Sequence, residues 1–418
     1  MDLSPDQLRV HDAVLAWLKA PYERLLTVGG LAGTGKTTVL GELAKHFPKP
    51  TAYVAPTNRA SSRLASKLVE GGMHITKLQR PPDGKLPSRK WRHLFDDSLP
   101  ENGGPPLCTT THSLLLRAII DSKTEELLGW QARTKLDRQY KLIVVDEASM
   151  VGDKMLLTLQ SHGVLVLAVG DHWQLPPVKE SGSLMQNPML RLEQIHRQAE
   201  GSSIIALARH VREGGRLRDF TGWDANCVLR PKSEEEAVVR ETLAERNRLD
   251  VTFIAWTNAT RVRLNRTARR LQGYEGLPVP GEPIVALSSY YPVCNGMRGL
   301  LTTPSFMDER RDWILHANVA FPDDGMAGDW HEMNAHQFSR LHPFKSVDEL
   351  RQIGIPAETM SGGGRAFDFA YCLTCHKAQG SQFDHVVVIY ERDRQDEESR
   401  RWNYTSISRA SKKLTVLA

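Results

Sequence analysis

The chain has 418 residues with 40% hydrophobic and 25% charged content, which is enough to bury two or more cores in two or three domains. No apolar run reaches the roughly 18 to 20 residues that span a bilayer, the N-terminus lacks a signal-peptide pattern, and five cysteines do not suggest a disulfide scaffold, so we expect a cytosolic protein. The net charge of +5 is mildly favourable for a polyanionic partner but far below that of a histone-like protein.

The first motif in chain order is a phosphate-binding pattern. Residues Gly30 to Thr37 fit G-x-x-x-x-G-K-[ST] and lie between a predicted buried strand at residues 25–28 and a predicted helix at residues 38–45. Gly33 and Gly35 let the backbone approach a phosphate without an intervening Cβ. The loop N–H groups and Lys36 then face anionic oxygens, and the hydroxyl of Thr37 can hold Mg²⁺. The pattern predicts that the chain binds a nucleoside triphosphate.

A second motif places two carboxylates at the end of a strand. Apolar residues 142–145 precede Asp146 and Glu147, a pattern typical of a buried parallel strand. Ligands bind at the carboxyl edge of open α/β sheets, so we expect Asp146 to hold the Mg²⁺ shell and Glu147 to orient and deprotonate the attacking water. The alternative is that the acid pair only caps a helix. A third predicted strand, residues 164–169, leads to Gly170 and Asp171 at the same edge.

Together these segments resemble the motifs of superfamily 1 helicases, with the closest likeness to the RecD and Dda group and a compact, phage Dda-like length. Residues 30–37, 146–149 and 170–178 resemble motifs I, II and III. The further matches are motif Ia at residues 55–58, a DNA-contact motif at 110–114, motif IV at 192–198, motif V at 374–384 and motif VI at 404–410.

The resemblance implies an α/β fold with two RecA-like P-loop domains, each a parallel sheet flanked by helices, plus a small β-hairpin insert and a small SH3-like β insert. Residues 251–258 and 386–390 are the predicted buried strands of the second domain. The expected domains are 1–185 with a hairpin pin at 117–140, then 186–280 with 366–418, and the SH3-like insert at 281–365.

The resemblance also implies the catalytic and nucleotide-binding residues, with ATP and Mg²⁺ as cofactors. An arginine suits the γ-phosphate because its guanidinium stays charged and fits phosphate oxygens in a bidentate way. The expected catalytic residues are Lys36, Asp146, Glu147, Gln174, Arg197 and Arg409, with Thr37 and Asp146 at the metal. The expected nucleotide contacts are Gln7, Gly33, Thr34, Gly35, Lys36, Thr37, Thr38 and Gly380. Gln7 would read adenine, and its alternative is an exposed helix residue.

The single strand of nucleic acid would lie along small polar groups that contact backbone without reading sequence. The expected contacts are Thr57, Asn58, Thr111, His112, Asn258, Thr374 and His376. Each could instead be a helix cap or a turn residue. After Asn258 the predicted helix carries Arg263, Arg266 and Arg270 opposite an apolar stripe, and these arginines either track phosphates or form a solvated face.

The accessory segments carry weaker signals. Trp130 could separate a duplex or simply pack its own hairpin. The aromatic residues Trp313, Trp330, Phe338 and Phe344 would mostly form the core of the SH3-like insert. Cys372 and Cys375 form a C-x-x-C without a second pair or a histidine set, so we expect no metal site there. The charged run 391–401 is expected to be a solvated loop.

By this resemblance the chain is an ATP-dependent DNA helicase that moves 5′ to 3′ on single-stranded DNA. Its expected partners are single strands and single/double-strand junctions, with replication or recombination proteins as further candidates, and it would act as a monomer away from membranes in a bacterial or phage-infected cell. Three alternatives remain: an ATP-switched nucleic-acid translocase or remodeller that does not separate strands, a motor with RNA as its substrate, and an unrelated P-loop enzyme such as a small-molecule kinase.

Overall fold

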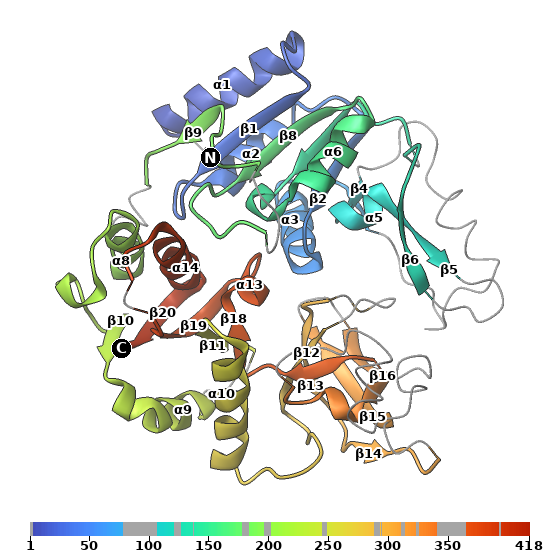
Figure 1. The fold of residues 1–418 in the computed structure, drawn as a ribbon. Coiled ribbons are helices and arrows are strands. Elements are labelled where there is room, and N and C mark those ends of the chain that lie inside the picture. The colour runs from blue at the N-terminus through green and yellow to red at the C-terminus, as the bar shows by residue number, and fades with distance from the viewer. Residues whose placement is uncertain are drawn as a thin grey trace. The chain divides into compact units, whose positions relative to one another are not determined.

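The computed structural model describes most of the chain, arranged in two compact units, Met1–Ser202 and Ser203–Ala418 (Figure 1). The described residues are 3–77, 107–120, 127–136, 138–177, 184–195, 202–244, 249–287, 293, 295–310, 314–322, 326–340, 365–392 and 394–418. Within these ranges, no helix combines the length and the apolar composition that a bilayer crossing requires.

The first unit is built on a seven-stranded sheet in which every pair of neighbouring strands is parallel. In spatial order its strands are β3 (Thr76–Lys77), β4 (Leu107–Thr110), β2 (Thr51–Ala55), β7 (Leu142–Val145), β8 (Leu165–Gly170), β1 (Leu25–Gly30) and β9 (Leu190–Leu192). The helices are α1 (Pro5–Lys19), α2 (Lys36–Ala44), α3 (Asn58–Glu70), α5 (Thr111–Leu115), the 3₁₀ turn η1 (Ala148–Met150) and α6 (Asp153–Ser161).

Both faces of this sheet are buried, which explains the continuous apolar runs in the sequence. Successive side chains of a strand point to opposite faces. Leu142 and Val144 of β7 accordingly belong to one core, shared with α1, α2 and α3, while Ile143 and Val145 belong to a second core shared with α5 and α6. The predicted α/β architecture is confirmed in this unit.

The first unit extends further than the sequence indicated. The predicted boundary at residue 185 is too early, because β9 pairs with β1 through Val28 and Leu190 and so completes the sheet. The predicted hairpin at 117–140 is narrower in the structure, where β5 (Leu116–Ile120) pairs antiparallel with β6 (Leu127–Ala132). The chain after β6 returns to the sheet, since Tyr140 lies in the second core.

The second unit contains a five-stranded sheet whose paired strands are again all parallel. In order its strands are β10 (Cys227–Arg230), β20 (Ala410–Leu417), β19 (Phe383–Ile389), β11 (Val251–Ala255) and β18 (Cys372–Thr374). The helices are α8 (Ser203–Arg212), α9 (Glu235–Leu243), α10 (Asn258–Leu271), α13 (Cys375–Ala378) and α14 (Glu397–Ile407), with 3₁₀ turns η2 (Leu217–Asp219) and η3 (Lys232–Glu234). The expectation of two parallel α/β sheets is thus confirmed.

An antiparallel accessory sheet is inserted between α10 and β18. Its elements are β12 (Pro283–Ala286), β13 (Arg298–Leu301), β14 (Phe306–Met307), β15 (Ile314–Phe321), β16 (Met326–Asn334), the turn η5 (Ala335–Gln337) and β17 (Phe367–Phe369). The insert therefore reaches past the predicted end at residue 365, because β17 pairs with β12. Its likeness to an SH3 fold stays a prediction.

Two buried arginines, Arg261 and Arg298, and the partly buried Arg269 fasten the accessory sheet to the parallel sheet. A buried guanidinium needs several acceptors, because each unpaired donor would cost desolvation energy. The contacts are Arg261 with Asp368, Arg269 Nε with Glu282 Oε1 at 2.8 Å, and Arg298 with the carbonyl oxygens of Leu249, Val251 and Ala370 at 3.0, 3.2 and 2.9 Å. The two acidic side chains are fully buried. These contacts tie the accessory sheet to the second parallel sheet within the second unit.

Two expectations for accessory segments are wrong. Trp330 is 53% exposed and therefore does not belong to the insert's core. Its ring stacks on that of His316, with 5.0 Å between the ring centroids. Phe338 does pack against that core, whereas Trp313 and Phe344 lie outside the described residues. The charged run 391–401 is not a loop throughout, since α14 begins at Glu397.

We predict that Asp368→Asn lowers the free energy of unfolding by about 3 to 5 kcal/mol, because it leaves the Arg261 charge buried without its counterion. Urea denaturation followed by tryptophan fluorescence measures this change. Lys412→Gln is the matched control, since it removes an exposed ion pair with Asp384 and should cost at most about 1 kcal/mol. Equal losses in both variants would contradict the anchoring role of the buried pair.

Candidate nucleotide and nucleic-acid sites

The phosphate loop has the strand, turn and helix that its pattern requires. β1 ends at Gly30, and α2 begins at Lys36. Gly33 and Gly35 have φ values of 85° and 74°, a left-handed conformation that favours glycine. The Lys36 ammonium donates to the carbonyl oxygens of Gly30 at 2.6 Å and Leu31 at 3.1 Å, so it lies folded over the loop. The structure thus brings the expected phosphate contacts from Gly33 to Thr38 together in one turn.

Gln7 is joined to this loop by side-chain hydrogen bonds. It is only 3% exposed, so the alternative of an exposed helix residue is wrong. Its Oε1 accepts from the backbone N–H of Ser4 at 3.0 Å in a capping box at the start of α1, and its Nε2 donates to the carbonyl oxygen of Thr34 at 3.2 Å. The first turn of α1 is therefore tied to the phosphate loop, next to the expected nucleotide contacts.

Asp146 and Glu147 follow directly after β7 at the carboxyl edge of the first sheet. The Glu147 N–H donates to Asp146 Oδ1 at 2.9 Å, and Glu147 has a φ of 50°, an uncommon conformation for a residue other than glycine. Burial and the neighbouring Glu147 carboxylate raise the pKa of Asp146 to about 6, while Lys36 acts in the opposite direction. Among the described residues, Glu147 Oε2 is buried without a hydrogen-bond partner. A buried unpaired carboxylate oxygen is costly, which indicates that a ligand or water belongs there.

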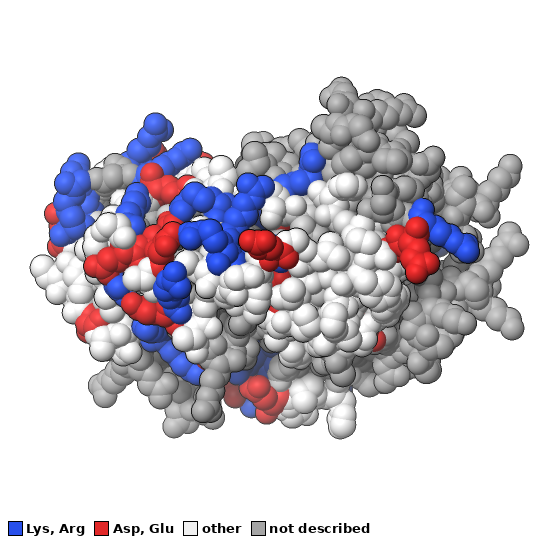
Figure 2. All heavy atoms as spheres, turned by 90° about the horizontal axis from the view of Figure 1, so that it is seen from below, with Lys and Arg blue, Asp and Glu red and all other residues white. Residues whose placement is uncertain are grey.

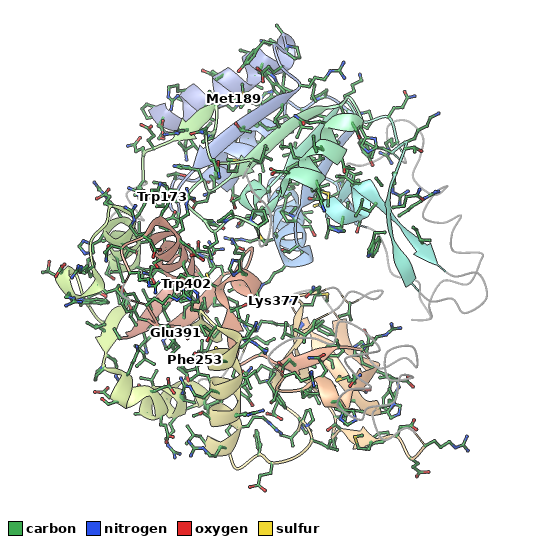
Figure 3. The ribbon with its side chains drawn as sticks, in the orientation of Figure 1. Trp173, Met189, Phe253, Lys377, Glu391 and Trp402 are labelled. Atoms are coloured by element: carbon green, nitrogen blue, oxygen red, sulfur yellow. The ribbon has the colours of Figure 1, made fainter. Side chains whose placement is uncertain are left out.

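The neighbouring strand β8 supplies the third polar cluster. A Cβ on Gly170 would lie 3.0 Å from the backbone nitrogens of Ala148 and Ser149, so glycine lets β8 and the turn after Glu147 pack closely. Asp171 is fully buried and accepts from the N–H of Trp173 at 3.0 Å (Figure 3). Gln174 is 5% exposed and lies in the same turn, where its N–H donates to the carbonyl oxygen of Asp171 at 3.2 Å.

In the second unit, Arg409 and Gly380 lie at one turn. Arg409 is 6% exposed, and its guanidinium donates to the carbonyl oxygens of Thr405 at 3.1 Å and Ser381 at 3.2 Å. Gly380 adopts a left-handed conformation with a φ of 71° immediately before Ser381. The structure therefore brings the two expected nucleotide-site residues of this unit together. Arg197 lies outside the described residues.

Four strand-to-helix turns share one design in the two units. Each turn follows a parallel strand, has a threonine in extended conformation at the N-cap and leads into a helix. The four turns are Thr57 between β2 and α3, Thr110 between β4 and α5, Thr257 between β11 and α10, and Thr374 between β18 and α13. The Thr57 hydroxyl accepts from the N–H of Ala60 at 3.2 Å, which is the helix-cap alternative. Within each unit the two strands are direct neighbours, so the turns lie side by side.

The expected nucleic-acid contacts lie in these turns. Thr111 Oγ1 is buried without a partner among the described residues, and the His112 ring meets the ring of Trp130 edge-on at 6.2 Å. Asn258 Oδ1 accepts from Arg261 Nε at 3.1 Å. The side chain of Asn58 lies outside the described residues.

In α13, Thr374 makes no side-chain cap bond, and burial lowers the pKa of His376. The next residue, Lys377, was not singled out from the sequence, although burial lowers its pKa to about 8. Its ammonium donates to Asn295 in the turn between β12 and β13 (Figure 3). This contact links the helix of motif V to the accessory sheet.

Glu391 is the second side chain that the sequence did not single out. Its carboxylate accepts from the backbone N–H groups of Trp256 and Thr257 and from the hydroxyls of Thr257 and Thr260, so it fixes the start of α10 (Figure 3). A carboxylate is favourable at a helix N-terminus, where N–H groups are unpaired and the dipole is positive. Its position directly after an apolar strand was the available signal.

No group of three or more His, Cys, Asp or Glu side chains that could hold a metal occurs in the described part of the chain. Cys372 and Cys375 are both buried in the core of the second unit, and burial raises the pKa of Cys375 to about 12. This arrangement fits thiols that pack as apolar groups.

Comparisons with known proteins agree with this geometry. A family model described as an AAA domain matches residues 2–226, more than half of the chain, and a UvrD-like helicase C-terminal domain matches residues 369–417. The ATP-dependent RecD2 DNA helicase of Deinococcus radiodurans is 40% identical over 222 residues, which are 51% of this chain and 24% of that protein. An uncharacterised protein of Methanocaldococcus jannaschii is 30% identical over 109 residues, 26% of this chain and 9% of that protein. The chain thus spans a quarter or less of the length of these relatives.

Solved structures share the fold over the whole chain. A Pif1 helicase from a study of DNA unwinding at forked double-stranded DNA has 18% identity and a TM-score of 0.52, covering 100% of this chain and 92% of that one. The Pif1 helicase from Bacteroides in complex with ADP-AlF3 and single-stranded DNA has 17% identity and a TM-score of 0.52, covering 100% and 93%. The narrower likeness to Dda stays a prediction. The chain belongs to the AAA domain family, whose model matches more than half of it.

Proposed function

We propose that the chain is an ATP-dependent DNA helicase that moves 5′ to 3′ along a single strand and separates duplex DNA. The observation that carries the proposal is the buried Glu147 Oε2 beside Asp146, which has no hydrogen-bond partner among the described residues and lies at the same sheet edge as the phosphate loop. The RecD2 relative and the Pif1 structures support DNA as the substrate and ATP as the fuel, and the direction of movement is taken from the resemblance to that group.

The residues at the edge of the first sheet fit a triphosphate with Mg²⁺. Lys36 would place its charge against the phosphates, and Thr37 and Asp146 would hold the metal, which supplies charge neutralisation at the phosphates when bound. Glu147 would then orient a water molecule and accept its proton. Its Oε2 has no hydrogen-bond donor among the described residues, so it is free to take a donor from that water. Arg409 and Arg197 would stabilise the charge that develops on the γ-phosphate.

The four threonine turns support a nucleic-acid track. Each offers a small polar side chain and the positive end of a helix, which suit phosphates and sugars and carry no information about base sequence. The exposed Trp130 ring, at 50% exposure beside His112, supports a role for the β5–β6 hairpin at a strand junction. A translocase that does not separate strands remains the second candidate if this hairpin proves inert.

The first experiment measures ATP hydrolysis with Mg²⁺ in the presence and absence of single-stranded DNA, and then unwinding of duplexes with a 5′ or a 3′ tail. Strong stimulation by DNA and unwinding of the 5′-tailed duplex alone are expected. A rate that DNA leaves unchanged would reject the motor function, and stimulation by RNA in place of DNA would change the substrate. Light scattering with and without DNA tests the monomer that we propose.

We predict that Glu147→Gln lowers ATP hydrolysis by about 10² to 10⁴ while nucleotide still binds, because the variant keeps the shape of the side chain and loses only the base. Lys36→Ala should lower both nucleotide affinity and hydrolysis. Lys45→Ala, which removes an exposed lysine paired with Glu42 at the end of α2, is the control and should retain full activity. Hydrolysis at the wild-type rate in the Glu147 variant would refute its proposed role.

Arg409→Ala should lower DNA-stimulated hydrolysis by about 10³ to 10⁵, the range for an arginine that stabilises a transferring phosphoryl group. Arg409→Lys should not restore it, because an ammonium cannot bind phosphate oxygens in a bidentate way. The control is Arg401→Ala, which removes an exposed ion pair of α14. Full activity in the Arg409→Lys variant would show that Arg409 acts only through its positive charge. Thermal unfolding of both variants checks that the turn at Ser381 stays folded.

The raised pKa of Asp146 predicts a pH dependence. With a pKa of about 6 this carboxyl group is neutral below pH 6 and ionised above it, and only the ionised form binds Mg²⁺ well. Mg²⁺-dependent nucleotide affinity should therefore fall as pH decreases through about 6. Because metal and proton compete, a higher Mg²⁺ concentration should move the midpoint to lower pH. A midpoint that does not respond to Mg²⁺, measured with a fluorescent ATP analogue, would contradict the assignment.

A further inference from the structure

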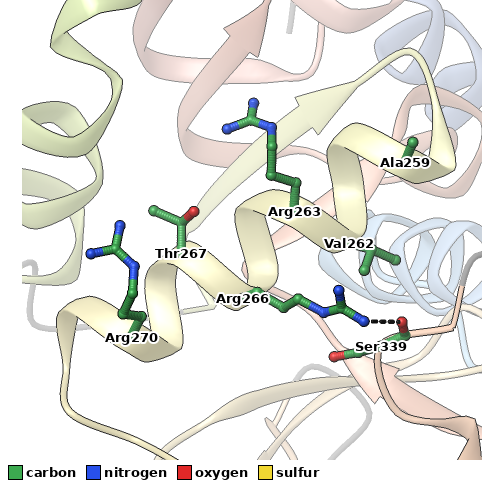
Figure 4. A pocket seen from close by; sticks show the side chains of 7 residues that line it. All are labelled: Ala259, Val262, Arg263, Arg266, Thr267, Arg270 and Ser339. Carbon is green, nitrogen blue, oxygen red and sulfur yellow. Dashed lines mark hydrogen bonds between the residues drawn. The ribbon is translucent and has the colours of Figure 1, made fainter.

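A pocket of about 570 Å³ lies along the outward side of α10 (Figure 4). Six residues of this helix line it, together with Ser339, which follows the turn after β16. The lining residues are Ala259, Val262, Arg263, Arg266, Thr267, Arg270 and Ser339. None of them belongs to the nucleotide site or to the four threonine turns.

The helix presents this side to solvent because its opposite side is buried. Leu264 and Ala268 lie in the core of the second unit, while Arg263 and Arg270 are 52% and 60% exposed. Seen from below in Figure 2, the side of this unit that carries α9 and α10 has basic and acidic side chains interleaved, and the surface beside it is largely uncharged. The pocket thus combines an apolar floor with three guanidinium groups.

The three arginines differ in their partners. Arg263 forms a two-pronged ion pair with Glu235 of α9, and Arg270 pairs with Glu236. Arg266 instead donates at 3.4 Å to the neutral carbonyl oxygen of Ser339. Three positive charges therefore face two negative ones. The Arg270–Glu236 pair is exposed on both sides, and such a pair contributes only about 0 to 1 kcal/mol, so a phosphate can replace Glu236 at little cost.

The pocket continues from one of the expected nucleic-acid contacts. Asn258 is the first residue of α10, and Ala259 is the first residue of the pocket. Along the helix axis Arg266 lies roughly 4.5 Å beyond Arg263, and Arg270 roughly 6 Å beyond Arg266, at 1.5 Å per residue. A chain that leaves the turn at Thr257 would meet these guanidinium groups in succession.

We propose that this α10 pocket binds the phosphate backbone of a DNA segment that extends beyond the threonine turns. The inference rests on the proposed function, because it adds a second contact for the same polymer. Guanidinium groups bind phosphate oxygens with paired donors, and phosphates carry no information about base sequence, so binding is independent of sequence. The segment is either a longer single strand or the backbone of an adjoining duplex.

The test compares DNA of different lengths by fluorescence anisotropy over a range of salt concentrations. The shortest oligothymidylate that stimulates ATP hydrolysis fully defines the main track. A longer oligothymidylate, and a duplex with a tail of the minimal length, should bind the wild-type protein more tightly. Two variants should lose this gain in affinity: the single variant Arg266→Gln and the double variant Arg263→Gln with Arg270→Gln. The slope of log affinity against log salt concentration should decrease by about one for each arginine removed. If only the longer oligothymidylate binds more tightly, the pocket holds single-stranded DNA; if only the tailed duplex does, the pocket holds the duplex backbone.

Two variants sharpen the test. Glu236→Gln removes the competitor of a phosphate at Arg270 and should increase affinity for the longer ligand, which a merely structural role of the arginines would not produce. Arg209→Gln is the matched control, since it removes an exposed arginine that pairs with Glu213 on α8, and it should behave as wild type.

The inference is overturned if the α10 variants bind the longer ligands with wild-type affinity and salt slope, or if they lose the same factor on the minimal oligothymidylate. Both results presuppose that DNA stimulates hydrolysis in the wild-type protein. Absence of that stimulation would instead reject the proposed function, so the two failures are distinguishable.

Discussion

The candidate sites depend on one constraint: the central strands of both parallel sheets are buried, so they carry mostly apolar side chains until they end. In β7 every residue belongs to one of two cores, so the first polar side chain that the strand can carry is Asp146. The same holds for β8, which ends at Gly170 and is followed by Asp171, and for β11, after which Thr257 caps a helix. Because parallel strands end at a common edge, residues far apart in sequence meet there without an additional structural element to bring them together.

This constraint also explains how much could be predicted from the sequence. The phosphate loop, the central strands and α10 have local patterns of apolar residues, glycines and caps, and the structure has them as expected. The end of the first unit was misplaced because β9 has only three residues and too little pattern to detect. Trp330 was assigned to a core because aromatic content does not tell which face of β16 a residue occupies. Glu391 follows an apolar strand directly, but it was missed because its partners at the start of α10 lie more than a hundred residues away in the chain.

The same strand-to-helix turn occurs in both units, but different side chains hold it in place. Residues 55–58 and 255–258 share the pattern Ala-x-Thr-Asn, each at the end of a strand whose neighbour carries a second threonine turn. In the second unit Glu391 fixes the helix start, and Asn258 contacts Arg261, whose guanidinium is paired with Asp368 of the accessory sheet. The accessory sheet therefore bears directly on the position of Asn258.

The insertion of the accessory sheet has a consequence for how the second unit folds. β18 pairs with β11, with Phe253 opposite Cys372, although the whole accessory sheet lies between them in the chain. Pairing over such a sequence separation carries a loop-closure cost and slows folding, unless the intervening segment folds first and brings its ends together. Both neighbours of β11, which are β18 and β19, follow the insert in the chain, so during synthesis both edges of β11 stay open until the insert has emerged. Early formation of the accessory sheet would shorten the period in which these edges can pair with another chain.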